Sequence, residues 1–323
     1  MCDKRLHQRV LLTVAILNYN GLERLKRSIP SILAQDYEPK EVLVLDNASQ
    51  DDSVKYLNQF KEIKTIAARS NLGYGVGKNI LVEKAQGDYV LMLDNDIELC
   101  GKDFLSKIYW EYIALDNPAY LSPLLCDIGK NDVDCGGFYF NKINKNAELR
   151  KIANTGVLKV PRYVGGVCFF KKSMFGELGG FDEIYPFNID DYDMSARAYL
   201  NGYVNYRTTN LMAVHNGSDT RTNIKALCWK RQYYFSGFSR MVWKNYKLRN
   251  VIIWWPISAA WISYKSIRTS IRNRSVDPLL ANLKSIRFFI RDFRDTLKWR
   301  KNIQMKRHVH EDLFLRIKYL RSC

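Results

Sequence analysis

Short apolar runs alternate with helix-like stretches along the first hundred residues of this chain, and this alternation limits the folds that the chain can adopt. The apolar runs at 10–17, 41–45, 63–68 and 89–93 have the length of buried strands. Between them, residues 22–35, 51–60 and 75–85 have the length and composition of helices. This repeating order predicts an α/β fold with a doubly wound, mostly parallel (mixed) sheet and helices on both faces.

Acidic residues follow two of these strands. Asp46 directly follows the second run, and the triplet Asp94-Asn95-Asp96 follows the fourth. A third acidic cluster lies at 190–193. Because the carboxyl ends of parallel strands form the edge where open α/β sheets bind ligands, we expect the first two groups to gather there. Clustered carboxylates repel one another unless a cation joins them, and a hard divalent cation also suits a nucleotide's diphosphate. The pattern predicts a protein that handles a metal-bound nucleotide.

The positive charge is concentrated in the last quarter of the chain. Residues 244–323 contain 19 Lys and Arg but 5 Asp and Glu, so they account for +14 of the overall net charge of +17. A chain of 323 residues is also long for one compact core, which favours a main domain with an appendage. A basic appendage binds polyanions, either nucleic acid or an anionic membrane surface.

The apolar content of the appendage favours the membrane. Residues 250–264 have no charge and three Trp, but they are shorter than the about 20 residues that span a bilayer and include Pro256. Trp and Tyr beside Arg249 and Lys265 are typical of an interfacial segment, and a buried helix is the alternative. Residues 279–293 have the pattern of an amphipathic basic helix. We expect a main domain at 1–246, a helical, membrane-associating region at 247–323, and no nucleic-acid partner.

Targeting and cysteine signals are weak. Residues 1–17 lack the features of a cleavable signal peptide, and the seven cysteines have no C-x-x-C spacing. We therefore expect a cytoplasmic protein, peripheral on the inner face of the cell membrane, with neither a disulfide framework nor a zinc site.

A glycine-rich segment at 73–77 imitates a dinucleotide-binding fingerprint. Its spacing is G-x-G-x-G instead of G-x-G-x-x-G, and it lies in the third strand–helix unit instead of the first. A nicotinamide site is therefore disfavoured. We expect these glycines to let the backbone approach another ligand, with Lys78 and Asn79 supplying polar contacts.

Five motifs in order resemble glycosyltransferase family 2, especially its rhamnosyltransferase-like bacterial branch. They lie at 14–21, 44–51, 71–79, 93–96 and 179–193, and the resemblance covers about residues 10–246. It implies the GT-A fold, a nucleotide-diphosphate sugar donor, a divalent cation (Mn or Mg) and inversion at the anomeric carbon.

The resemblance also implies roles for individual residues. It makes Asp191 the catalytic base, with Asp190 beside it, although Asp190 replaces the family's usual Glu. It makes Asp96, Asp94 and His215 the metal ligands. The nucleotide-sugar contacts that it implies are Asn18, Tyr19, Asp46, Asn71, Lys78, Asp94, Asn95 and Gly166. Structural alternatives stay open, because Asp46 suits a turn, Asp190 and Asp191 suit the first turn of a helix, and a lone His is often structural.

The residues and the resemblance together predict an inverting hexosyltransferase. Its donor would be a dTDP- or UDP-sugar, with rhamnose as one candidate, and its acceptor a lipid-linked saccharide or oligosaccharide of bacterial surface polysaccharide biosynthesis. The alternatives are a polyprenyl-phosphate sugar synthase and, from another class, a noncatalytic protein that binds nucleotide sugars or polyanions.

Overall fold

A mixed sheet forms the centre of the computed structural model, which describes residues 10–127, 132–134, 156–160, 162–185, 189–216 and 224–312. Its strands are β1 (Leu12–Asn18), β2 (Lys40–Asp46), β3 (Ile63–Ala67), β4 (Tyr89–Asp94), β5 (Ile97–Leu99), β6 (Pro118–Asp127), β7 (Asp132–Asp134), β8 (Val157–Lys159), β9 (Val167–Lys171) and β10 (Val204–His215). They lie in the order β3-β2-β1-β4-β9-β6-β10-β5, with β7 beside β6 and β8 beside β10. The predicted first strand at 10–17 corresponds to β1.

The part of the sheet formed by β3, β2, β1 and β4 is parallel. In its register, Asn18 of β1 lies beside Asp46 of β2, and Leu17 lies beside Asp94 of β4. Asn18, Asp46 and Asp94 are the last residues of their strands. They therefore share the carboxyl edge of the sheet, as the apolar runs before them predict.

The other part of the sheet is mixed. Strand β9 runs antiparallel to both β4 and β6, and β10 runs parallel to β6. Strand β5 pairs antiparallel with β10, and this pairing places His215 beside Ile97. Because Asp96 directly precedes Ile97, the same pairing brings His215 to the acidic triplet.

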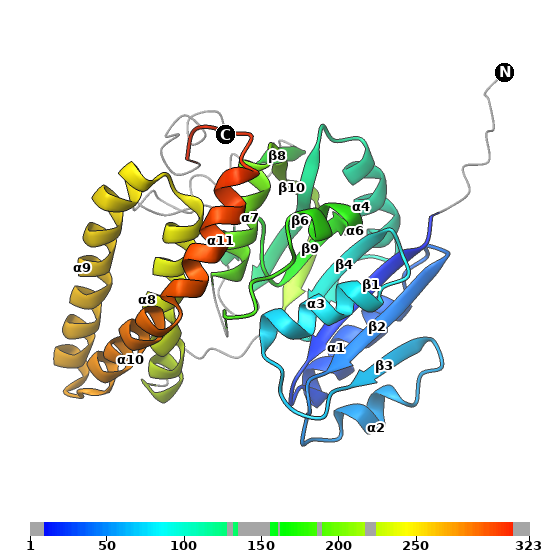
Figure 1. The fold of residues 1–323 in the computed structure, drawn as a ribbon. Coiled ribbons are helices and arrows are strands. Elements are labelled where there is room, and N and C mark those ends of the chain that lie inside the picture. Colours follow the sequence, from blue (N-terminus) through cyan, green and yellow to red (C-terminus); the bar gives the residue numbers. More distant parts are fainter. Residues whose placement is uncertain are drawn as a thin grey trace.

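Helices cover both faces of this sheet (Figure 1). They are α1 (Leu22–Leu33), α2 (Ser53–Leu57), α3 (Tyr74–Lys84), α4 (Phe104–Ile113), α6 (Lys172–Glu177) and α7 (Asp190–Leu200). Helices α1 and α4 share a core with Val14 and Ile16, whereas α3, α6 and α7 share a core with Ala15 and Leu17. Strand β1 is thus buried on both sides, which explains its nearly continuous apolar sequence.

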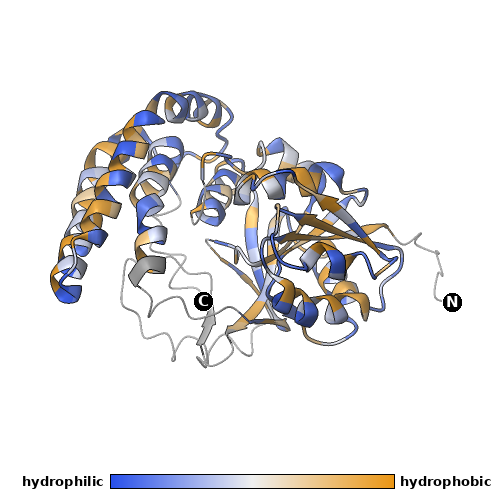
Figure 2. Ribbon diagram, turned by 90° about the horizontal axis from the view of Figure 1, so that it is seen from below, coloured by the Kyte–Doolittle hydropathy of each residue, from blue (hydrophilic) through white to orange (hydrophobic). Residues whose placement is uncertain are grey.

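Four longer helices follow the sheet in the described part of the chain: α8 (Ile224–Asn245), α9 (Leu248–Asn273), α10 (Asp277–Arg291) and α11 (Phe293–Met305). Helix α8 contacts α7, α9, α10 and α11. Hydrophobic and hydrophilic residues are mixed along these helices (Figure 2). Helices α9, α10 and α11 confirm the predicted C-terminal helical extension. Among the residues described, none of the helices combines the length and apolarity that a membrane span requires.

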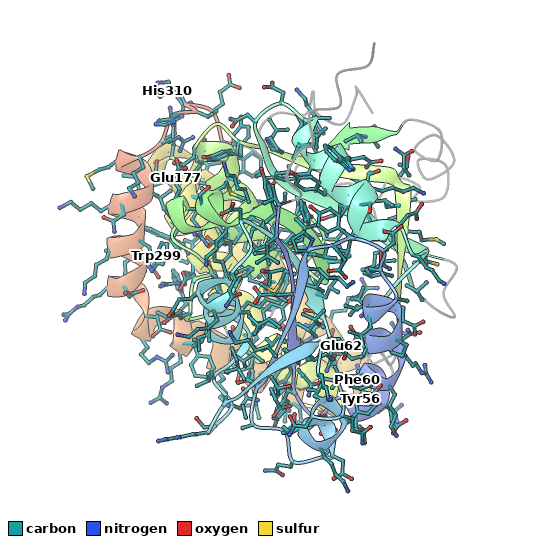
Figure 3. All side chains as sticks on the ribbon, turned by 90° about the vertical axis from the view of Figure 1, so that its right-hand side faces the viewer. Tyr56, Phe60, Glu62, Glu177, Trp299 and His310 are labelled. Carbon is teal, nitrogen blue, oxygen red and sulfur yellow. The ribbon has the colours of Figure 1, made fainter. Side chains whose placement is uncertain are left out.

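The second predicted helix, at 51–60, is shorter in the structure. Asp51 lies before the helix, where its side chain accepts a hydrogen bond of 3.1 Å from the Ser53 N–H. The chain leaves the helix after Leu57 through a tight turn, in which the Phe60 N–H donates to the Leu57 carbonyl over 3.1 Å. The rings of Tyr56 and Phe60 meet edge to face at 5.2 Å and lie together at this end of the molecule (Figure 3). Local side-chain contacts therefore end α2 early.

Candidate active site

A hydrogen-bonded cluster lies where β1 and β2 end. Asn18 Nδ2 donates to Asp46 Oδ1 over 2.8 Å, and Asn95 Nδ2 donates to Asn18 Oδ1 over 2.7 Å. The Ser49 hydroxyl also donates to Asp46, over 2.6 Å. Asn18, Asp46 and Asn95 are buried, whereas Tyr19 is exposed. These hydrogen bonds hold the edge of the sheet in place. Of the predicted donor-binding residues where β1 and β2 end, Tyr19 is exposed to solvent.

The glycine-rich segment and its neighbours have mainly structural contacts. A Cβ on Gly77 would lie 2.6 Å from a methyl carbon of Leu17, so this glycine lets α3 pack closely on β1. Asn79 accepts a hydrogen bond of 2.8 Å from the Phe181 N–H and donates one of 2.9 Å to the Phe181 carbonyl. Asn71 accepts two hydrogen bonds at the loop before α3. Gly77 and Asn79 thus hold the fold, and the expectation that this segment also faces a ligand stays a prediction.

Asp94 is held by two side chains of α3. Lys78 Nζ lies 2.9 Å from Asp94 Oδ1, and the Tyr74 hydroxyl donates to the same oxygen over 3.0 Å. Lys78 is buried and also bonds to Tyr74, while the Asp94 side chain is 30% exposed. Burial and the charge of Asp94 raise the pKa of Tyr74, so its hydroxyl stays protonated and can donate. The charge of Lys78 balances that of Asp94, and the two contacts fix the orientation of the Asp94 side chain.

Asp96 and His215 form a pair at the end of β10. His215 Nε2 lies 3.3 Å from Asp96 Oδ2. Burial opposes the charge of Asp96, but the hydrogen bond and charge of His215 outweigh burial and hold the pKa of Asp96 below its usual value. The other oxygen, Asp96 Oδ1, is buried without a hydrogen-bond partner among the described residues. This arrangement fits a cation held by a carboxylate and an imidazole, although no group of three or more acidic, His or Cys side chains forms a metal cluster in the described ranges.

Two neighbouring carboxylates occupy the start of α7. Ile189, just before them, has a φ of 82°, a left-handed conformation that a branched residue rarely adopts. Asp191 forms an ion pair with Arg162, and its Oδ1 accepts a hydrogen bond of 2.9 Å from the Tyr192 N–H. Burial, followed by the charge of Asp191, raises the pKa of Asp190 to about 7. The two side chains therefore have different surroundings, and strained backbone at Ile189 is typical of a functional site.

The loop at Gly165 and Gly166 separates the two acidic groups. The Asp94 N–H donates to the Gly166 carbonyl over 2.9 Å. A Cβ on Gly165 would lie 3.4 Å from Asp191 Oδ2, and one on Gly166 would lie 3.6 Å from Asp94 Oδ2. Side chains at these two positions would fill the space between the carboxylates. Glycine at both positions therefore leaves the space between the side chains of Asp94 and Asp191 open.

One cavity of about 1470 Å³ joins these groups. Of the residues predicted from the sequence, it is lined by Asp94, Gly166, Asp190, Asp191 and His215. The others lie behind its wall or along the sheet edge and do not line it: Asn18, Tyr19, Asp46, Asn71, Lys78, Asn95 and Asp96. The remaining lining comes from Tyr74, Leu125, Arg162, Val164, Gly165, Ile189, Tyr192, Tyr234, Phe238 and eight residues of α9.

Several lining residues had no signal in the sequence. Arg162 lies with its guanidinium 4.6 Å from the centre of the Tyr192 ring, next to Asp191, but no motif surrounds it. Tyr74 is the second residue of the glycine-rich segment, and the sequence gives no sign of its bond to Asp94. The aromatic residues of α9 fall in the segment 250–264, for which the sequence predicts contact with a membrane surface. Only the packing of distant segments shows that all of these residues face one cavity.

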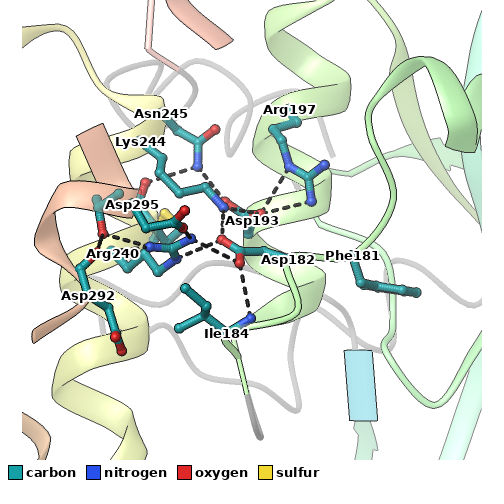
Figure 4. A network of polar contacts seen from close by, with 12 residues as sticks. Phe181, Asp182, Ile184, Asp193, Arg197, Arg240, Lys244, Asn245, Asp292 and Asp295 are labelled. Carbon is teal, nitrogen blue, oxygen red and sulfur yellow. Dashed lines mark hydrogen bonds and ion pairs between the residues drawn. The ribbon is translucent and has the colours of Figure 1, made fainter. Parts of the chain in front are cut away.

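A buried ionic network holds α7 against α8 (Figure 4). Lys244 Nζ pairs with Asp193 Oδ2 at 2.9 Å and also with Asp182, while Arg240 Nε donates to Asp182 Oδ2 over 2.7 Å. Arg197 completes the network with a contact of 2.9 Å to Asp193, which lies one turn before it on α7. Burial opposes the charge of Asp182, but Lys244 and Arg240 hold its pKa below the usual value. The position of helix α7 thus depends on cations from α8.

Comparison with known protein families decides the family of the chain. Residues 13–178, which are half of the chain, match the sequence profile of glycosyl transferase family 2. The chain belongs to glycosyl transferase family 2. The resemblance carried by its five motifs is therefore confirmed.

Curated relatives of this family 2 protein are glycosyltransferases. An uncharacterized glycosyltransferase of Haemophilus influenzae is 34% identical over 101 residues, which are 30% of this chain and 40% of that relative. The chain therefore matches less than half the length of that relative. The N-acetylglucosaminyl-diphospho-decaprenol L-rhamnosyltransferase of Mycobacterium tuberculosis is 22% identical over 297 residues, which are 81% of this chain and 94% of the relative.

Solved structures share the architecture of this family 2 chain. The crystal structure of GalNAc-T7 with UDP, GalNAc and Mn²⁺ superposes with a TM-score of 0.61 at 15% sequence identity, covering 90% of this chain and 58% of that one. At this identity the likeness shows the fold alone. It confirms the predicted mixed α/β sheet of the GT-A type.

Proposed function

We propose that this protein moves a sugar from a nucleotide-diphosphate donor to a hydroxyl of a lipid-linked saccharide, with inversion at the anomeric carbon, in bacterial surface polysaccharide biosynthesis. The donor is a dTDP- or UDP-sugar, with rhamnose as a candidate. The proposal rests mainly on one observation: Asp94, Asp190, Asp191 and His215 line the same cavity. The name of the mycobacterial relative, an N-acetylglucosaminyl-diphospho-decaprenol L-rhamnosyltransferase, supports both the sugar and the lipid-linked acceptor.

Asp96, His215 and Asp94 would hold a divalent cation, Mn or Mg. The buried Asp96 Oδ1, which has no hydrogen-bond partner among the described residues, and the adjacent imidazole fit such an ion. The cation would neutralise charge on the leaving diphosphate. Lys78 and Tyr74 hold the Asp94 carboxylate towards the cavity, where a nucleotide's ribose or the cation can meet it. The Mn²⁺ and UDP in the GalNAc-T7 structure support this assignment.

Asp191 is the base in this proposal. The acceptor hydroxyl oxygen forms the new bond to the anomeric carbon, the bond from that carbon to the diphosphate oxygen breaks, and the bonding pair leaves with the diphosphate. Asp191 takes the hydroxyl proton, which requires it to lie within hydrogen-bond reach of the acceptor. Arg162 pairs with Asp191, so the acceptor hydroxyl must share this carboxylate with the guanidinium.

Asp190 supports the acceptor in this proposal. Its raised pKa lets the carboxyl group carry a proton below about pH 7, so that it can donate a hydrogen bond to a sugar oxygen while Asp191 accepts one. A second negative charge beside the base would repel the diphosphate, and the protonated carboxyl group avoids this.

The helical region 247–323 associates with an anionic membrane in this proposal, and residues 1–246 form the transferase domain. Helix α9 has no acidic residue and exposes several large apolar side chains, among them Ile252, Ile253 and Ile271. Basic residues beside apolar ones favour an anionic lipid surface. A cytoplasmic enzyme, peripheral on the inner face of the cell membrane, would meet a lipid-linked acceptor there.

A donor-hydrolysis assay tests the proposed function. Purified protein is incubated with UDP-, dTDP- and GDP-sugars, and both nucleoside diphosphate release and the anomeric configuration of the freed sugar are followed by NMR. We expect release from one donor, with water replacing the acceptor and the configuration inverted. Retained configuration would overturn the inverting mechanism, and release from none of the donors by folded protein would favour a noncatalytic binding protein.

A further inference from the structure

The cavity has two chemically different ends. One end holds the carboxylates Asp94, Asp190 and Asp191 at the sheet edge. The other end is formed by α8 and α9 and is lined by apolar and aromatic residues: Tyr234, Phe238, Trp254, Ile257, Ala260, Trp261, Ile262 and Tyr264. Because both ends belong to one continuous space, a ligand at the carboxylates can extend along α9 without leaving the protein.

The α9 wall retains much exposed apolar surface. Trp254, Ile257 and Trp261 line the cavity and are each more than two-fifths exposed. Trp261 and Tyr264 stack with ring centres 5.6 Å apart, which makes a flat apolar surface on this side of the helix. Leaving such side chains in water is unfavourable, and a wall of this kind is typical of a binding site for an apolar group.

Positive charge accompanies this apolar wall. Lys265 lines the cavity with its Nζ 5.2 Å from the centre of the Trp261 ring, and Arg162 lines it beside Asp191. No acidic residue occurs between 248 and 273. The only carboxylates among the described lining residues are those at the sheet edge. An anionic group joined to an apolar chain would therefore meet complementary charge and surface at the α9 end.

We propose that the α9 wall is an acceptor subsite for an apolar chain that carries a phosphate or diphosphate. The chain lies along Trp254, Ile257 and Trp261, and Lys265 binds the phosphate. This inference rests on the proposed function and deepens it, because the enzyme itself then recognises the lipid part of the acceptor. Binding of the lipid at the α9 wall then fixes the position of the attached saccharide relative to Asp191, whereas association with a bilayer surface alone does not fix it.

Two isoleucines one turn apart on α9 make a matched test. Ile253 and Ile257 are 55% and 57% exposed, but only Ile257 lines the cavity. Binding of decyl phosphate, inorganic phosphate and decanol, all below micellar concentrations, is followed by tryptophan fluorescence in the full-length protein. We expect decyl phosphate to bind wild type and Ile253→Ala alike, and Ile257→Ala about tenfold more weakly because part of the apolar contact is lost.

A third variant tests the phosphate end. Lys265→Gln is expected to weaken decyl phosphate binding severalfold and to leave decanol binding unchanged. Equal losses in Ile253→Ala and Ile257→Ala would indicate a general membrane surface and overturn the subsite. Failure of wild type to prefer decyl phosphate to inorganic phosphate would also overturn it. Donor hydrolysis by the same preparations separates the two failures, because it reports the proposed function without any acceptor.

Discussion

At the scale of single residues, the surroundings of Asp191 matter most for the proposed reaction. Arg162 pairs with its carboxylate, and the Tyr192 N–H bonds to Oδ1. These contacts hold the side chain in a defined direction and favour its charged form, which is the form that accepts a proton. Asp190, one position earlier, lacks the arginine pair and has a raised pKa. Adjacent acids thus receive different roles from different neighbours.

Replacing Asp191 by Asn should lower kcat for sugar transfer by about 10² to 10⁴, because Asn cannot take the acceptor proton. Nucleotide affinity should stay at the wild-type value, since the residues proposed to hold the cation are unchanged. Asp190→Asn is the matched control and should cost less activity, because a neutral amide still donates a hydrogen bond. Wild-type turnover by the Asp191 variant would remove that residue from the role of base.

The raised pKa of Asp190 predicts a pH dependence of stability. Folding raises the pKa of Asp190 from its ordinary value of 3.8 to about 7, so the folded protein holds a proton that the unfolded chain releases. The stabilisation is complete below about pH 4 and is lost as the pH rises through about 7. The Tm of wild type should therefore fall relative to that of Asp190→Asn between about pH 5 and about pH 8. Parallel Tm curves for the two proteins would contradict this.

The sequence allowed the site residues at the ends of strands to be predicted, but few of the site residues elsewhere. Asp46, Asp94 and Asp96 follow apolar strands, so their edge could be placed from the sequence, and His215 follows from the resemblance. Arg162 could not be predicted, because its partner Asp191 comes from a distant helix and the intervening segment has no periodic pattern. Asn79 looked like a ligand contact, but its partner is the backbone of Phe181.

At the scale of helices, the position of α7 depends on the helices that follow the sheet. Lys244 of α8 is fully buried between Asp182 and Asp193. Asp193 lies on α7 two positions after Asp191, the predicted catalytic base. The basic composition of residues 244–323 predicts binding to a polyanion, but it could not show that Lys244 neutralises acids inside the fold. Burial gives this lysine a different role from that of the exposed basic residues around it.

Replacing Lys244 by Met should lower the free energy of unfolding by about 3–5 kcal/mol, because two buried carboxylates then lose a cation. Denaturant unfolding at neutral pH measures this. Lys247→Met, three positions later and partly exposed, is the control and should change stability little. If both variants unfolded at the same denaturant concentration as wild type, the network would not hold α7.

At the scale of the whole molecule, the positive charge and the exposed apolar face lie on the same helices. The appendage cannot be tested by deletion, because Arg240 of α8 pairs with Asp295 of α11 and truncation would expose buried surface. Point variants avoid this. Arg268 and Arg272 are exposed on α9 and suit the purpose.

Arg268→Gln and Arg272→Gln should each weaken binding to anionic vesicles about fivefold, which corresponds to about 1 kcal/mol per basic residue. Lys61→Gln, an exposed position beside β3, should have no effect. Co-sedimentation at fixed salt measures the affinity, with RNA binding at the same salt as a comparison. Stronger binding to RNA than to vesicles would contradict the assignment to a membrane.

The central claim is that Asp96 and the neighbouring residues bind a nucleotide sugar through a divalent cation. Calorimetric titration of wild type and Asp96→Asn with UDP-, dTDP- and GDP-sugars, in Mn²⁺, in Mg²⁺ and in chelator, tests it most directly. We predict that wild type binds one nucleotide tightly only with the cation, and that Asp96→Asn loses the difference between cation and chelator. Equal binding in chelator, or no binding by folded wild type, would contradict the account.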